Sequence, residues 1–192
     1  RRDARRGRRH RDLLERLASL REVRIAELQR GQDVALFGSV ETCEETRPSP
    51  GTGEPAVYYQ ARALVDGEAR LADVHHGHFY LQSGDTRILV ATRDALDLLP
   101  LTRGPADAGW FDWLDATWSA GSPAPIEFMA ELTRIVPGSS ILVVGRVRAE
   151  PGGAAFAVSS GSKARHPPLL AAEPLPELIR RLSRPARRAK WL

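Results

Sequence analysis

Apolar and polar residues alternate with a period of two along most of the middle of the chain. The alternation is clearest in residues 56–65, where Val57 and Tyr59 occupy positions of one parity and Tyr58 and Gln60 those of the other. Because successive side chains of a strand point to opposite faces, this pattern predicts β-strands. Similar segments are residues 33–41, 69–76, 79–82, 87–90, 126–133, 141–147 and 154–159. Clusters of Gly, Pro and Asp separate them, so we expect a mainly β fold.

Two of the predicted strands carry a glycine at the same relative place. Gly38 follows the turn glycine Gly31 at the same spacing as Gly145 follows Gly138, and a valine comes two residues later in both segments. A glycine inside a strand permits the sharp bend that the corner of a small barrel requires. The chain is therefore expected to form a small antiparallel β-barrel or sandwich of the OB-like kind.

Three segments depart from the strand pattern. Residues 10–22 carry an apolar stripe with the 3.6-residue period of an amphipathic helix, formed by Leu13, Leu14, Leu17 and Leu20. Residues 92–99 are expected to form a short helical turn, and residues 177–182 a short helix. The prolines around the last segment favour a linker there.

Residues 102–125 form a Trp-rich segment bounded by Gly and Pro. It contains Trp110, Trp113 and Trp118, and its large apolar residues fall mainly on one helical face. We expect a short helical insertion, packed against the barrel or lying at a membrane interface, where Trp is enriched. Asp112 and Asp115 argue against binding to anionic lipid. The three tryptophans are candidates for interaction with a partner.

Residues 49–61 lead a rigid loop into a strand with adjacent tyrosines. The loop contains Gly51-Thr52-Gly53, but no Gly-Lys-Ser/Thr follows, so a turn is favoured over a phosphate-binding loop. In a strand, one tyrosine of the pair is expected to face the core and the other the solvent. Tyr58 and Tyr59 are therefore candidates for contact with a partner.

The charge is distributed unevenly. Residues 1–11 contain seven Arg and one Asp, hence +6, and residues 180–192 contain five Arg and one Lys, hence another +6. Since the whole chain carries +4, residues 12–179 carry 4 − 12 = −8. The N-terminal block is expected to be a solvated tail, a cytoplasmic juxtamembrane segment or an arm for nucleic acid. The acidic body argues against nucleic acid as its partner, because phosphate binding needs cations.

The sequence contains no recognisable catalytic set. A single cysteine, Cys43, excludes an internal disulfide and a thiolate-rich zinc site. His76 and His78, with His75 beside them, are weak candidates for a metal site, with Asp73 as the one further ligand that the sequence suggests. A surface turn is the simpler interpretation, so neither a metal nor a cofactor is expected. Asp73 and Asp85 lie near the histidines in sequence, but nothing fixes their geometry, so we expect no enzyme.

Several short motifs resemble the GIDE, or "beside a membrane", domain family, to which the membrane-flanked domain of Mulan-type mitochondrial E3 ubiquitin ligases belongs. They are residues 31–40, Ser49-Pro50 with Val57-Tyr58-Tyr59, Phe79-Tyr80-Leu81 with Gly84, and Glu131 with Pro137-Gly138 and Val144-Gly145. The resemblance covers about residues 24–160. Ala56 stands where the family often has Cys, and the Trp-rich segment is an elaboration. One cysteine cannot supply the ligands of a RING finger, so ligase activity is not expected of this chain.

The resemblance implies a β-domain held beside a membrane, usually between two membrane-spanning helices. The first residue is Arg, so the chain is expected to be a piece of a longer protein. Residues 1–23 are then a basic juxtamembrane tail and amphipathic helix, residues 24–160 the β-domain, and residues 161–192 a Pro-rich linker, short helix and basic tail. By the positive-inside rule, the basic ends place the domain on the cytoplasmic side of a bacterial inner membrane. The expected function is non-catalytic protein interaction or sensing, with an unknown protein partner; the alternative is an OB-like domain that binds single-stranded nucleic acid.

Overall fold

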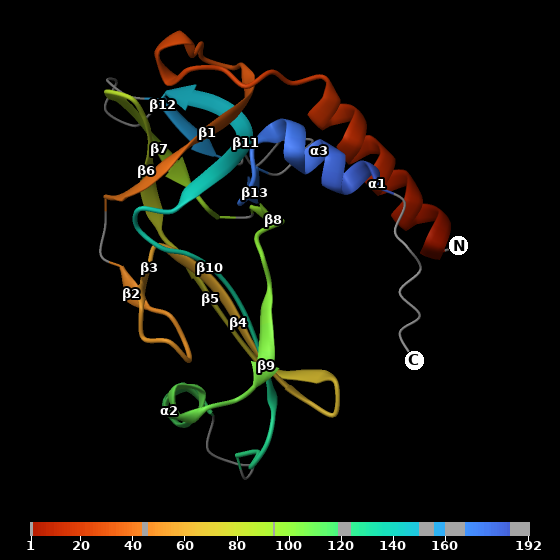
Figure 1. The fold of residues 1–192 in the computed structure, drawn as a ribbon, viewed down its shortest axis with the longest axis vertical. Coiled ribbons are helices and arrows are strands. Elements are labelled where there is room, and N and C mark those ends of the chain that lie inside the picture. Colours follow the sequence, from red (N-terminus) through yellow and green to blue (C-terminus); the bar gives the residue numbers. More distant parts are fainter. Residues whose placement is uncertain are drawn as a thin grey trace.

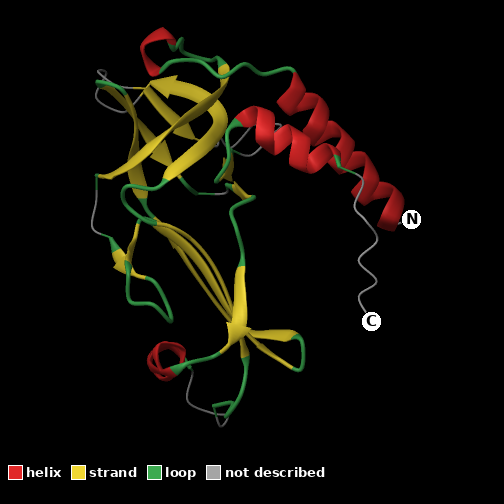
Figure 2. Ribbon diagram, in the orientation of Figure 1, coloured by secondary structure: helices red, strands yellow, loops and turns green. Residues whose placement is uncertain are grey.

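The computed structural model describes residues 2–43, 46–93, 95–118, 124–149, 156–159 and 168–184. Within these ranges the chain forms thirteen β-strands, three α-helices and one 3-10 helix, η1 (Ile25–Glu27). The expected mainly β fold is therefore confirmed. Figures 1 and 2 show a group of curved strands, a four-stranded sheet that extends from it, and a pair of helices against one side.

Five strands of the larger sheet pair in a ring. They are β1 (Asp33–Thr42), β6 (His78–Ser83), β7 (Thr86–Ala91), β12 (Phe156–Ser159) and β11 (Ser140–Ala149), and β11 pairs with β1 again. Neighbours are antiparallel, except that β7 and β12 are parallel over two residue pairs. This short contact leaves the ring partly open, as in the five-stranded, OB-like arrangement that was expected.

The two glycine-bearing strands of the sequence pattern are neighbours in this ring. In the antiparallel register of β1 and β11, Gly38 lies opposite Ile141 and Gly145 lies opposite Val34. A Cβ atom at Gly38 would lie 2.2 Å from the carbonyl oxygen of Gln82 in β6. Glycine is therefore required where β1 crosses closely over β6.

A four-stranded antiparallel sheet extends from the ring in the order β5-β4-β10-β9. Its strands are β4 (Tyr58–Val65), β5 (Glu68–His76), β9 (Thr102–Pro105) and β10 (Met129–Ile135). The β4–β5 hairpin is inserted between β1 and β6, whereas β9, the helix α2 (Ala108–Thr117) and β10 are inserted between β7 and β11. The short strands β2 (Arg47–Pro48) and β3 (Pro55–Ala56) pair in the loop before β4.

Two apolar clusters share the strands β4 and β10. One fills the ring and includes Tyr58 and Ile135. The other lies between the four-stranded sheet and α2 and includes Tyr59 and Leu132. Because alternate residues of β4 and β10 point to opposite faces, the two insertions join both cores into one body.

A third cluster holds the helices against the outside of the ring. Leu17 of α1 (Arg2–Ala18) and Leu178 of α3 (Leu175–Ser183) are both fully buried there, together with Leu142 of β11. The cluster also includes β13 (Leu169–Ala171), which pairs with β11 and, in parallel, with β8 (Leu96–Asp97). The apolar stripe at the N-terminus therefore packs on its own domain.

Four details differ from the sequence-based expectations. The first helix already begins at Arg2, within the basic block. Within residues 92–99, expected to form a helical turn, Leu96 and Asp97 form the short strand β8 and pair with β13. Residues 169–171, expected within a linker, are a buried strand. The Trp-rich helix packs on the four-stranded sheet, because Ala61 and Ala63 of β4 leave room for its indoles there.

No helix among the described residues has the length and the apolar character needed to cross a membrane. The segment 154–159 is described only from Phe156 onward, and residues 185–192 of the basic C-terminal tail lie outside the described residues.

Candidate functional site

The Trp-rich helix α2 covers one face of the four-stranded sheet. Asp107 caps its N-terminus by accepting a hydrogen bond from the Trp110 backbone N–H at 3.3 Å. Trp110 is buried, and its ring meets Trp113 edge to face with centroids 5.4 Å apart. Trp113 and Trp118 are half-buried and belong to the same cluster. The three candidate tryptophans therefore contribute chiefly to packing between α2 and the sheet.

A close contact between two glycines fixes this helix against the loop before β4. A Cβ atom at Gly109 would lie 2.3 Å from the carbonyl oxygen of Gly51. Gly51 has a φ of +78°, and a Cβ there would lie 2.2 Å from Nε1 of Trp110. The Gly51-Thr52-Gly53 segment is thus a turn on which α2 rests, as the absence of a P-loop motif suggested.

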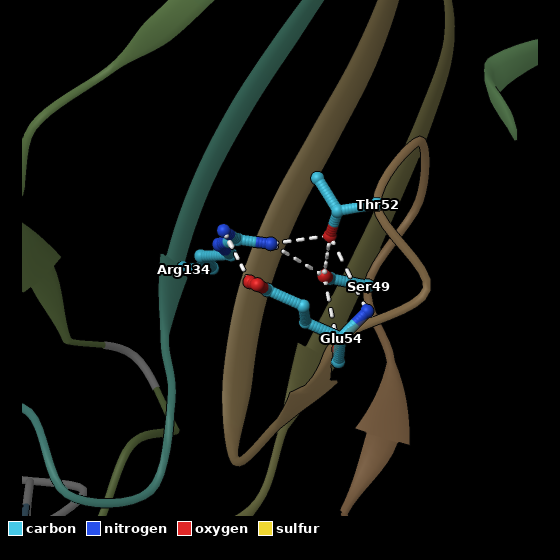
Figure 3. A network of polar contacts seen from close by, with 4 residues as sticks. All are labelled: Ser49, Thr52, Glu54 and Arg134. Carbon is cyan, nitrogen blue, oxygen red and sulfur yellow. Dashed lines mark hydrogen bonds and ion pairs between the residues drawn. The ribbon is translucent and has the colours of Figure 1, made fainter.

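A polar network closes the same loop onto β10 (Figure 3). Nη2 of Arg134 lies 2.5 Å from Oε2 of Glu54, and its Nη1 donates to the hydroxyl groups of Ser49 and Thr52. Ser49 also lies 2.8 Å from Thr52, hydroxyl to hydroxyl. The hydroxyl groups of Ser49 and Thr52 therefore bind an arginine of the same chain and not a phosphate-containing ligand.

Tyr58 and Tyr59 are both buried, so the expectation that one of them faces solvent is wrong. The reason is that the start of β4 lies between two cores, one on each face of the sheet. Tyr59 donates to Oδ2 of Asp73 at 2.8 Å, and Tyr58 donates to Oδ2 of Asp97 at 3.2 Å. Burial, together with the Asp73 carboxylate, raises the pKa of Tyr59 to about 12. Burial and the negative charge of Asp97 likewise raise the pKa of Tyr58.

Asp97 lines a small polar cavity of about 210 Å³ on the face of the sheet opposite α2. Its Oδ1 accepts a hydrogen bond from the Leu99 backbone N–H at 2.8 Å. Burial raises the pKa of this carboxyl group, and the Leu99 N–H and the Tyr58 hydroxyl oppose the shift. Gln60, Arg62 and Thr133 form other parts of the wall. No sequence pattern pointed to Asp97, because β8 has only two residues and becomes defined only by its pairing with β13.

The histidines lie at the junction of β5 and β6. His76 packs against the ring of Tyr58 and His75 against that of Tyr59, with centroids 5.8 and 5.6 Å apart, as cross-strand neighbours. His76 ends β5 and His78 begins β6, and both are exposed. Among the described residues, no group of three or more His, Cys, Asp or Glu side chains has the geometry to hold a metal ion.

A larger groove of about 720 Å³ lies at the far end of the four-stranded sheet. It is bounded by the β4–β5 turn, by the connection from β9 to α2 and by the chain that enters β10. Ile126 and Met129 border it, and both are exposed. The alternation in residues 126–133 had predicted a strand that begins at Ile126. The strand begins only at Met129, so Ile126 is left in the preceding loop and is 89% exposed.

Comparison of the chain with models of protein families, with curated proteins and with solved structures gave no match.

Proposed function

We propose that this chain is a non-catalytic, membrane-tethered β-domain, and that it serves as a protein-interaction or sensing module on the cytoplasmic face of a bacterial membrane protein. The arrangement of α1 and α3 is the main support. The backbone N–H of Leu175, at the start of α3, donates to Glu22 just after α1 at 2.6 Å. The ring of His10, in the middle of α1, lies 3.1 Å from the carbonyl oxygen of Leu182 near the end of α3. The two helices are thus antiparallel, and the start of α1 and the end of α3 lie at the same end of the pair (Figure 1).

The helices α1 and α3 belong to strongly basic ends of the sequence. Residues 1–11 and residues 180–192 each carry +6, whereas the body between them carries −8. Cytoplasmic flanks of membrane helices are enriched in Lys and Arg, and such residues are attracted to anionic lipid by about 1 kcal/mol each. A domain joined at both ends to membrane-spanning segments would have this polarity, with the helix pair toward the membrane and the acidic body away from it.

The tether is tested by sedimentation of the chain with vesicles of phosphatidylcholine, with and without phosphatidylglycerol. We expect binding only to the anionic vesicles, with an affinity that falls as salt is added. Replacing Arg8, Arg9, Arg180 and Arg184 by Gln should weaken binding at least tenfold, given about 1 kcal/mol for each residue. Replacing Arg70 and Arg87, two exposed arginines of the β-domain, should leave it unchanged.

A second experiment tests where the domain lies in the cell. Expressed in bacteria within its parent polypeptide, the domain should fractionate with membranes and resist protease added to intact spheroplasts. Recovery in the soluble fraction, or digestion from outside, would refute the tether or its cytoplasmic orientation.

The alternative function, binding of single-stranded nucleic acid, draws support from the OB-like ring alone. Tyr58, Tyr59 and Phe79 are buried and have no face open for a base. Tyr80 is half-buried, and the guanidinium of Arg87 covers its ring at 4.3 Å from the centroid. Fluorescence anisotropy with labelled single-stranded DNA tests this function: binding that persists without residues 1–11 and 180–192 would favour it over the tether.

A further inference from the structure

The groove at the far end of the four-stranded sheet is apolar and open. Phe111 and Phe128 meet edge to face in it, with ring centroids 5.3 Å apart. Leu64, Ile126 and Met129 form further parts of its lining. Its volume of about 720 Å³ lies within the usual range of ligand sites.

The most exposed large apolar side chain of the described residues lies at this groove. Ile126 is 89% exposed, and Met129 beside it is 37% exposed. Ile126 lies outside β10, so the sheet itself does not require an apolar residue there. Grouped apolar exposure of this kind is typical of a surface that another molecule covers.

The charge around the groove is negative. The four-stranded sheet and α2, over residues 58–76 and 102–135, contain four Arg and eight Asp or Glu, a formal charge of −4. Asp66 and Glu127 line the groove, are exposed, and form no ion pair within the part of the chain that the structure describes. Arg103 also lines the groove, but it lies 3.7 Å from Glu131, and the carboxylate of Glu131 offsets its positive charge. An acidic segment or an anionic lipid headgroup would thus be repelled, whereas a cation would find the carboxylates of Asp66 and Glu127, neither of which pairs with a described cationic residue.

We propose that this groove binds a basic, apolar polypeptide segment, in which a large apolar side chain lies next to Lys or Arg. The apolar side chain packs between Ile126 and the phenyl rings, and the neighbouring cation lies beside Asp66 and Glu127. Apolar anchors surrounded by complementary charge are the usual basis of such recognition. The groove chemistry carries this proposal independently of the proposed tether.

The experiment uses fluorescence anisotropy of short labelled peptides with the whole chain, in solution without vesicles. The first peptide combines Lys with Leu and Phe, the second has Glu in place of Lys, and the third has Gly and Ser in place of Leu and Phe. We expect the first to bind, with an affinity that falls as salt is added, and the others to bind at least tenfold more weakly. Equal binding of the first two peptides would overturn the proposal. Because no membrane is present, the result is independent of the vesicle experiment.

Variants locate the binding. Ile126→Ser should weaken binding of the first peptide about tenfold, because burying a large apolar side chain raises affinity by at least about that factor. Asp66→Asn, which keeps a residue suited to its φ of +54°, should weaken peptide binding several-fold and reduce its salt dependence.

The control variant is Val74→Ser. It changes an apolar residue of β5 that is 44% exposed and outside the groove, and it should have no effect on peptide binding. Unchanged binding in Ile126→Ser, or an equal loss in Val74→Ser, would refute the site. So would a dimer of the free chain that Ile126→Ser dissociates, because a second copy would then occupy the groove.

Discussion

At the scale of single residues, Gly109 shows how a local preference is overridden by a contact. In an isolated helix, Ala in place of Gly is stabilising by up to about 1 kcal/mol. Here the added methyl group would lie 2.3 Å from a backbone oxygen of Gly51. We therefore expect Gly109→Ala to lower the free energy of unfolding by about 1–3 kcal/mol, as measured by urea denaturation. Gly104→Ala in β9, where no atom lies within 4 Å, is the matched control and should change it little. A stabilised Gly109→Ala would contradict the packing of α2.

We expect Asp97 to make the stability of the domain depend on pH. Because its pKa is raised in the folded state, the protonated carboxyl group is favoured by folding. Its contribution is therefore fully present below the pKa of the unfolded chain and is lost as pH rises through the folded value. We expect Asp97→Asn to flatten the decline of stability from acidic to neutral pH in urea titrations. Asp97→Ala should instead destabilise by about 1–3 kcal/mol, because the Leu99 N–H loses its acceptor. An unaltered pH profile in Asp97→Asn would show that the carboxyl group is not the cause.

At the scale of elements, the helices α1 and α3 belong to the folded domain. Leu178 of α3 is fully buried against the ring, together with Leu17 of α1. Leu178→Ala is expected to lower the free energy of unfolding by about 2–5 kcal/mol, which is typical of a buried leucine. Leu101→Ala, at a site that is 57% exposed, should change it by less than about 0.5 kcal/mol. If both variants were equally stable, α3 would be a detached linker helix, as its proline-rich surroundings suggested.

At the scale of the whole molecule, the ring and the four-stranded sheet should unfold together. Tyr58 and Ile135 belong to one core, and Tyr59 and Leu132, in the same two strands, belong to the other. In a Trp191→Phe background, the remaining tryptophans all lie in the α2 segment, so their fluorescence reports on that core. Urea transitions followed by fluorescence and by far-UV circular dichroism should coincide. Separate midpoints would mean that the insertion forms an independent unit.

Local sequence patterns were sufficient to predict most of the strands and the α2 helix. The alternation in β4 and β10 and the Asp-Gly turn between β4 and β5 are properties of neighbouring residues, and the structure contains them. The candidate site was harder to predict. Ile126 was expected within a strand, and one of Tyr58 and Tyr59 was expected to be exposed. The first error arises because the strand begins only at Met129, a boundary that alternation does not define. The second arises because periodicity predicts which residues share a face but not what covers that face.

The sequence by itself determined the β class of the fold, the glycines at the bends and the Trp-rich helix. It also determined the charge distribution, with a basic segment at each end and an acidic body between them. Each of these depends on the type and spacing of residues close together in the chain. The tertiary structure decided that β4 is buried on both faces, that residues 169–171 join the sheet, and that the start of α1 and the end of α3 lie at the same end of the helix pair. These depend on contacts between distant segments, and such contacts depend on the shape and charge of surfaces that local periodicity does not describe.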